Sequence, residues 1–186
     1  MMLFVGLGNP TPNSHNNRHN IGFKIVDAIN QKFGLSKQKP KFKGLLTTGN
    51  IAEQKIYAIK PLTFMNNSGI CIRELLEYFK IDAEDVIVFH DDLDIEFGKI
   101  KAKFGGSNAG HNGVASIDKF IGKDYSRVRV GIGKPKNMIP VSDFVLKDFD
   151  EEEKEQLDII LNNITDNLTI LIDKKLDLFS STINNK

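Results

Sequence analysis

The sequence predicts an α/β fold in a single domain, with a mixed, twisted β-sheet flanked by helices and an amphipathic helix at the C-terminus. Short apolar runs typical of buried strands alternate along the chain with segments of helical periodicity. Neither a repeat nor a linker interrupts this order. A chain of 186 residues can also bury about two-thirds of its unfolded surface without metals or disulfides. We therefore expect residues 1–186 to fold as one domain.

The first predicted unit is a strand, a loop and a helix. Met2 to Leu7 is an apolar run that Gly8-Asn9-Pro10 interrupts, which is typical of a buried strand entering a loop. Apolar side chains then recur at helical spacing from Ile21 to Phe33. Asn20 stands where an N-cap belongs, and Gly34 follows the last helical residue.

The middle of the chain predicts a hairpin, a helix and an interior strand. Residues 45–53 and 54–60 have the composition of two strands joined by a tight turn. Residues 68–79 place apolar side chains on one helical face. The apolar run 86–89 is typical of a strand buried on both faces, and His90-Asp91-Asp92 follows it directly.

The second half of the chain alternates in the same way. Residues 97–104 alternate apolar side chains with lysines, which predicts a strand with one wet, basic face. Residues 105–110 predict a mobile polar loop, and a helix near 113–121 and a strand near 127–132 follow it. Residues 150–171 begin with a capping-box pattern and continue with leucine and isoleucine at helical spacing. We expect one long amphipathic helix to close the domain.

Composition and charge narrow the class of protein. The chain is 40% hydrophobic and 26% charged, which is typical of a globular protein. The net charge of +1 gives no general attraction to nucleic acid, so any RNA contact must be local. The single cysteine, Cys71, lies in an apolar run, which favours a buried thiol in a reducing compartment. We find neither a signal peptide nor the roughly 20 apolar residues of a membrane span, and expect a cytoplasmic protein without a membrane partner.

Polar clusters fall in loops that follow strands or precede helices. They are Asn9-Pro10, Arg18-His19-Asn20, Thr63-Phe64-Met65-Asn66-Asn67, His90-Asp91 and Gly110-His111-Asn112-Gly113. In open α/β folds, ligands bind in the crevice beyond the ends of the strands. We therefore expect these clusters to converge on one cleft.

A histidine and an aspartate are the candidates for acid–base chemistry. His19 can accept a proton near neutral pH, and a carboxylate beside it would fix its tautomer and stabilise the imidazolium. Asp91 ends a buried strand and is the candidate, although spacing alone does not separate it from Asp92 and Asp94. The alternatives are a solvated helix-entry histidine and an aspartate that shapes a turn. His15 has no comparable partner, and we expect it to be exposed.

Water is the expected nucleophile. No serine or cysteine stands in a pattern such as Gly-x-Ser-x-Gly, which argues against a covalent acyl-enzyme. The amides of Asn66 and Asn112 could hold a carbonyl oxygen or a developing oxyanion. The alternative is that these asparagines cap the helices that follow them.

The sequence predicts neither a metal site nor a cofactor. The histidines and the cysteine show no zinc-type spacing. Gly6-x-Gly8 is similar to the start of a dinucleotide loop, but Thr11 stands where that loop has its third glycine.

These clusters, in this order, resemble the bacterial peptidyl-tRNA hydrolase family over almost the whole chain. The motifs are Val5 to Pro10, Arg18 to Phe23, Pro61 to Gly69, His90 to Asp94, Gly110 to Gly113 and Arg127 to Gly133. The resemblance implies a monomeric, metal-free esterase that cleaves the bond between a peptide and its tRNA. It makes His19 the general base and Asp91 the group that orients it. It also implies that Asn9, Asn66 and Asn112 line the cleft and bind the peptide and the tRNA terminus.

The same resemblance implies local contacts with tRNA. Lys103 and Arg127 match basic residues that face the acceptor end and its 5′-phosphate, and Phe64 belongs to the same tRNA-binding set. Lys99 and Lys101 share the strand face of Lys103 and could add to a phosphate clamp. The alternative for these lysines is a solvated sheet edge.

The chain departs from the family pattern beside the first cluster. Thr11 and Ser14 replace a glycine and a tyrosine, so we expect the turn after Pro10 to change. Two other functions remain open: a non-catalytic RNA-binding relative, and a general esterase or amidase for small acylated amino acids. The joint presence of His19 and Asp91 favours the enzyme.

Overall fold

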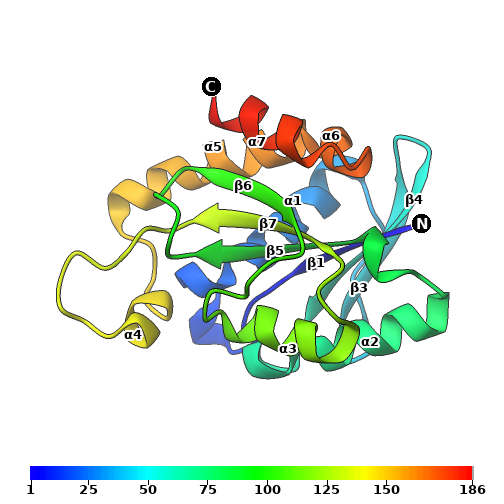
Figure 1. The fold of residues 1–186 in the computed structure, drawn as a ribbon, viewed down its shortest axis with the longest axis horizontal. Helices are drawn as coiled ribbons and strands as arrows, with labels where there is room; N and C mark the ends of the chain where they lie inside the picture. Colours follow the sequence, from blue (N-terminus) through cyan, green and yellow to red (C-terminus); the bar gives the residue numbers. More distant parts are fainter. Residues whose placement is uncertain (186) are drawn as a thin grey trace.

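A seven-stranded mixed sheet forms the middle layer of the computed structural model, which describes residues 1–185 (Figure 1). The strands lie in the order β2-β3-β4-β1-β5-β7-β6. Their bounds are β1 Met2–Gly6, β2 Lys39–Lys41, β3 Gly44–Ile51, β4 Gln54–Pro61, β5 Val86–Asp92, β6 Ile100–Phe104 and β7 Ser126–Gly131. The four strands β4, β1, β5 and β7 run parallel, and β2, β3 and β6 join antiparallel. The predicted mixed sheet is confirmed.

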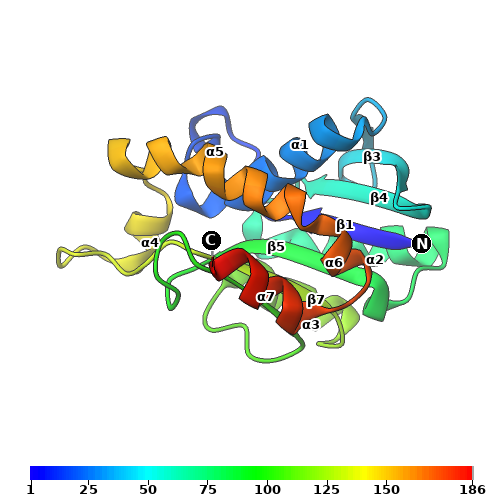
Figure 2. The same cartoon turned by 90° about the horizontal axis from the view of Figure 1, so that it is seen from above.

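Helices cover both faces of the sheet (Figures 1 and 2). One face carries α1 Ile21–Phe33, α5 Glu151–Asp166, α6 Leu168–Ile172 and α7 Leu176–Asn184, and the other carries α2 Ser68–Phe79 and α3 Asn112–Ile121. Alternating strand residues divide the core between the two layers: Phe4 and Phe89 pack toward the first, and Leu3 and Val88 toward the second. Short 3₁₀ turns cover Pro12–Ser14 (η1), Arg18–Asn20 (η2), Met65–Asn67 (η3) and Ala83–Asp85 (η4).

Three features differ from the sequence expectation. The tail is not one helix, because the chain leaves the helical path at Asn167 and again at Lys174, which has a φ of 60°. Residues 39–41 form an edge strand that their Lys-Pro-Lys sequence conceals, since proline is tolerated at a sheet edge. The short helix α4, Val141–Val145, was not predicted and lies beyond the carboxyl ends of the parallel strands (Figure 1).

Glycines bring the start of α1 against the sheet. A Cβ at Gly22 would lie 2.3 Å from the Leu7 nitrogen and 2.5 Å from the Phe89 oxygen, and one at Gly6 would lie 2.1 Å from the Gly22 oxygen. Only glycine permits this approach. It places η2, directly before α1, beside the carboxyl end of β5. None of the described helices is long and apolar enough to cross a membrane.

Candidate active site

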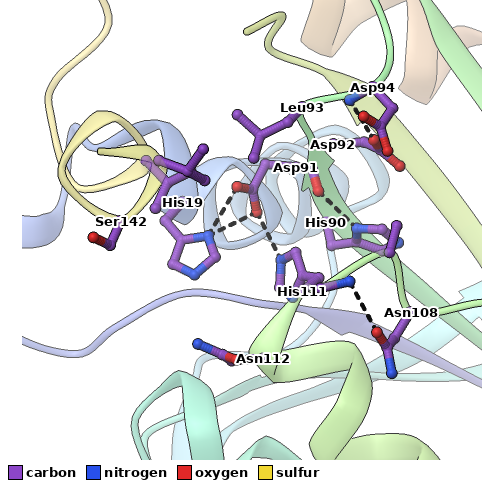
Figure 3. A pocket seen from close by; sticks show the side chains of 14 residues that line it. His19, His90, Asp91, Asp92, Leu93, Asp94, Asn108, His111, Asn112 and Ser142 are labelled. Atoms are coloured by element: carbon purple, nitrogen blue, oxygen red, sulfur yellow. Dashed lines mark hydrogen bonds and ion pairs between the residues drawn. The ribbon is translucent and has the colours of Figure 1, made fainter. Parts of the chain in front are cut away.

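Two histidines share one buried aspartate at the carboxyl edge of the sheet (Figure 3). Asp91, at the end of β5, has a side chain that is 2% exposed. Its carboxylate lies 2.8 Å from Nδ1 of His19 in η2, and 2.9 Å from Nε2 of His111 in the loop before α3. The predicted pair of His19 and Asp91 is therefore in hydrogen-bonding contact, and His111 is an addition that the sequence reasoning did not identify.

The start of α3 fixes the tautomer of His111. Its Nδ1 accepts from the backbone nitrogens of Gly113, at 3.1 Å, and Val114, at 3.3 Å, so it carries no proton. The proton is then on Nε2, which donates to Asp91. Because Asp91 also accepts from Nδ1 of His19, the Nε2 of His19 is left as the free acceptor. The arrangement presents His19 as a base.

The hydrogen bonds also distinguish Asp91 from its neighbours. Asp92 is occupied by the Arg129 guanidinium at 2.8 Å, and Asp94 is exposed with Lys134 at 3.7 Å. Burial by itself would raise the pKa of the Asp91 carboxyl, but the charges and hydrogen bonds of His19 and His111 outweigh it and lower that pKa. Asp91 is therefore ionised at neutral pH and can stabilise an imidazolium.

Asn9 is held by a reciprocal pair with Asn20. The backbone nitrogen of Asn9 donates to Asn20 Oδ1, and Asn20 Nδ2 donates to the Asn9 carbonyl, both at 2.9 Å. Asn9 Oδ1 accepts from the backbone of Met65 at 2.9 Å. Asn20 occupies the predicted N-cap position of α1, but its side chain makes no capping bond because it holds Asn9 instead. These bonds use the side-chain oxygen of Asn9 and leave its Nδ2 without a hydrogen-bond partner among the described residues.

Asn66 and Asn112 do not cap the helices that follow them. Asn67 occupies the N-cap position of α2 without a side-chain bond, and His111 caps α3. Within residues 1–185, the amides of Asn66 and Asn112 have no hydrogen-bond partner, and both side chains are exposed. The capping alternative is thus excluded, and both amides are free to bind a substrate.

The candidate residues line two adjoining cavities. The first, of about 380 Å³, includes Asp91, His111 and Leu93, and the second, of about 440 Å³, includes Asn9, Asn66 and Phe64. The residues that line both are His19, Asn112, Ser142 and Val145. The two cavities therefore form one continuous cleft with His19 at its middle.

Phe64 lines this cleft and has a strained backbone conformation. Its φ of 66° and ψ of 157° lie in a region that glycine normally occupies, and its side chain is 53% exposed. Such strain costs about 1–3 kcal/mol and persists where the surroundings enforce it. The bond from Met65 to Asn9 holds the next residue in place. An exposed aromatic ring thus stands at the mouth of the site.

The basic residues do not all lie as expected. Lys101 and Lys103 are exposed on β6. Arg127 is 2% exposed, and its guanidinium donates to Asp118 and to the carbonyls of Gly106 and Ser107. It therefore supports the loop before α3, and its predicted contact with tRNA stays a prediction. Arg129, not singled out from the sequence, is paired with Lys101 in the register and shares a groove with both lysines.

The loop after Pro10 contains Thr11 and Ser14, the two departures from the family pattern. Thr11 has a φ of −65°, so the turn avoids the left-handed region. The hydroxyls of Thr11 and Ser14 are hydrogen-bonded to each other, and both residues line the second cavity. His15, in the same loop, is exposed as predicted.

One group of side chains has the composition of a metal site. The ligand atoms of His19, Asp91 and His111 lie within 4.8 Å of one another. Their direct hydrogen bonds of 2.8 and 2.9 Å account for this proximity, and the Nε2 of His111 already carries a proton. The donor set therefore fits a hydrogen-bonded triad better than a zinc centre, whose ligand nitrogens must be unprotonated.

His90 lies under the triad and is buried. Its Nδ1 donates to the Asp91 carbonyl at 2.8 Å, its Nε2 is buried without a partner among the described residues, and its ring contacts that of His111. Burial, with the nearby His111 charge, lowers the pKa of His90 to about 4. Folding therefore requires a neutral imidazole.

This burial predicts a pH-dependent stability. In the unfolded chain His90 becomes protonated below its ordinary pKa of about 6.5, whereas in the folded chain it stays neutral down to about pH 4. Between these values the unfolded state binds more protons than the folded state. We expect the free energy of unfolding to fall through this range by up to about 1.4 kcal/mol per pH unit. His90→Gln should flatten this slope in urea titrations at pH 7, 5.5 and 4.5. An equally steep slope in the variant would assign the proton uptake to other groups.

This chain is similar to known proteins, in sequence and in fold, along nearly its whole length. The family model described as peptidyl-tRNA hydrolase matches residues 3–186. A peptidyl-tRNA hydrolase of Pelagibacter ubique is 80% identical over 186 residues, which are 100% of both chains. A second, of Dinoroseobacter shibae, is 49% identical over 166 residues, 89% of this chain and 71% of its own length.

A solved structure extends the likeness to three dimensions. The crystal structure of peptidyl-tRNA hydrolase from Acinetobacter baumannii superposes with a TM-score of 0.91 at 34% identity, covering 99% of this chain and 94% of that one. Family model, relatives and fold agree with the motifs in the sequence, and the chain therefore belongs to the peptidyl-tRNA hydrolase family.

Proposed function

We propose that this chain hydrolyses the ester bond between a peptide, or an N-blocked amino acid, and tRNA, and so returns tRNA to translation. The observation that carries the proposal is the hydrogen-bonded set of His19, Asp91 and His111 beside the unpartnered amides of Asn66 and Asn112. A base and a row of amide donors on one cleft are what attack on a carbonyl requires. We further propose that the protein works as a monomer in the cytoplasm, where its tRNA substrate is used.

The chemistry needs no covalent intermediate. Nε2 of His19 takes a proton from water while the water oxygen bonds to the ester carbon. The resulting oxyanion accepts hydrogen bonds from the Nδ2 groups of Asn66 and Asn112, and Asp91 stabilises the imidazolium. Collapse breaks the bond to the ribose oxygen, which takes the proton back from His19. The products are a free carboxylate and tRNA with an intact 3′ end.

The two cavities suit the two parts of the substrate. The second cavity offers the amides of Asn9 and Asn66, which can pair with peptide groups of the nascent chain. The first offers the apolar walls of Leu93, Val141 and Val145, which suit the base and ribose of the terminal adenosine. His19 then faces the ester that joins the parts.

The acceptor stem would continue toward β6. We assign phosphate contacts to Lys103, with Lys101 and Arg129 beside it, and a stacking contact to Phe64. Arg127 contributes by holding the loop that carries His111. A few such cations can bind a stem locally although the net charge is only +1.

Lys103→Ala should raise KM and lower the salt dependence of binding, with little change in kcat. A single lost phosphate contact reduces the slope of log affinity against log salt by about 0.7–0.9. Lys55→Ala is the matched control, because Lys55 is exposed on β4 at the end of the sheet opposite the cleft. A slope equal to that of the unmodified protein would remove Lys103 from the interface.

The direct test of the function is release of N-acetyl-aminoacyl groups from tRNA with chelator present. The same acylated amino acid on a small alcohol is run in parallel. Release from tRNA that greatly exceeds release from the small ester supports the proposal. Equal rates would indicate a general esterase, and tight tRNA binding without release would indicate an RNA-binding relative.

A further inference from the structure

Arg18 is buried next to His19, but its guanidinium points away from the reaction. The residue is 6% exposed. Its Nη2 lies 2.7 Å from Glu153 Oε1, its Nη1 donates to the Phe144 carbonyl at 3.3 Å, and its guanidinium carbon lies 4.1 Å from the centre of the Phe144 ring. Glu153 is itself fixed, because it forms the capping box of α5. All these partners belong to α4 or to the start of α5.

The main chain joins the same two segments. The pairs are Arg18 N with Lys147 O at 3.0 Å, Phe149 N with Asn16 O at 3.3 Å, and the β-bridge of Asn17 with Asp148. Main-chain hydrogen bonds therefore join residues 16–18, just before His19, to residues 147–149, just after α4. The Arg18 side chain continues this connection into α4 itself.

Helix α4 is a wall of the cleft. Its Ser142 and Val145 line both cavities, and Val141 lines the first. The helix has only five residues, too short to be stable alone, and the element it contacts most is η2, which contains Arg18. Phe144 anchors α4 in the core, and Arg18 contacts both the ring and the carbonyl of this residue, so Arg18 helps to hold the helix in place.

We infer that Arg18 is a positioning residue that holds α4 as a wall of the substrate cleft and thereby sets substrate affinity. It touches neither substrate nor the proton on His19. The guanidinium acts through its ion pair with Glu153, its bond to the Phe144 carbonyl and its stacking on the Phe144 ring. This inference builds on the proposed hydrolysis, since it assumes that the cleft receives the substrate.

Arg18→Gln should raise KM for N-acetyl-aminoacyl-tRNA about tenfold and leave kcat within about twofold, because a wall of the cleft acts in ground and transition states alike. In the free protein, amide hydrogen exchange in residues 141–147 should become at least about tenfold faster. The exchange is measured without substrate. It therefore tests the role of Arg18 even if the chain proves not to hydrolyse peptidyl-tRNA.

Phe144→Leu tests the same contact from the other side, because it removes the ring under the guanidinium and leaves residues 16–19 unchanged. It should reproduce the KM effect and the faster exchange at smaller amplitude. Arg73→Gln is the control: Arg73 also lies over a phenylalanine ring, that of Phe120 at 4.7 Å, but on the far layer of helices. It should change neither KM nor exchange in residues 141–147.

The alternative is that Arg18 only stabilises the fold or only orients His19. Uniformly faster exchange throughout the protein, with KM unchanged in Phe144→Leu, would overturn the inference in favour of stability. A loss of kcat at constant KM in Arg18→Gln would overturn it in favour of His19. If Arg18→Gln does not fold, Phe144→Leu decides alone, and an unchanged KM in that variant contradicts the inference.

Discussion

His19→Ala is expected to lower kcat by about 10²–10⁴, with a smaller change in substrate affinity. The imidazole is the proton acceptor for water, and no other described side chain at the centre of the cleft has a free acceptor nitrogen with an ionised carboxylate behind it. Initial rates at saturating N-acetyl-aminoacyl-tRNA measure the effect.

His15→Ala is the matched control for this substitution. His15 lies four residues earlier in the same loop and is exposed, so its loss should leave kcat unchanged. Turnover in His19→Ala close to that of the unmodified protein would remove His19 from the chemistry, whatever happens to affinity.

Asp91→Asn is expected to have an effect of similar size, because the new amide cannot satisfy both histidines. His111 must donate from Nε2, since its Nδ1 accepts from the start of α3. The amide oxygen is therefore drawn to His111, and the amide NH₂ turns to Nδ1 of His19. That reverses the tautomer of His19 and puts the proton on Nε2, where a base needs a lone pair. We expect kcat to fall by about 10²–10⁴.

Asp94→Asn controls for the loss of a nearby negative charge. Asp94 is exposed, three residues beyond Asp91, and contacts no histidine. It should keep nearly full activity. If Asp91→Asn instead raised KM and left kcat intact, Asp91 would be a binding group and the tautomer argument would be wrong.

Local sequence signals were sufficient for the family and most of the fold. The glycines and asparagines at the strand ends, and the apolar runs between them, can each be recognised within a few consecutive residues. The break of the tail at Asn167 was missed because leucine and isoleucine keep their helical spacing through it. The edge strand around Pro40 was missed because its stability comes from pairing with β3 and not from its own side chains.

The site was only partly predictable for a related reason. Sequence spacing could not choose among Asp91, Asp92 and Asp94, since the choice rests on partners distant in the chain: His19 for the first and Arg129 for the second. His111 belongs to one of the polar clusters in the sequence and stands directly before a helix. A polar residue at that position often caps the helix, and this was the signal that could have identified His111.

The central claim is that His19, oriented by Asp91, acts as the base for water. A double-mutant cycle with His19→Ala and Asp91→Asn tests it most directly, with kcat as the readout. If the two residues act as one unit, the double variant is no slower than His19→Ala alone. If the two losses multiply, each residue contributes independently and Asp91 does not act through His19.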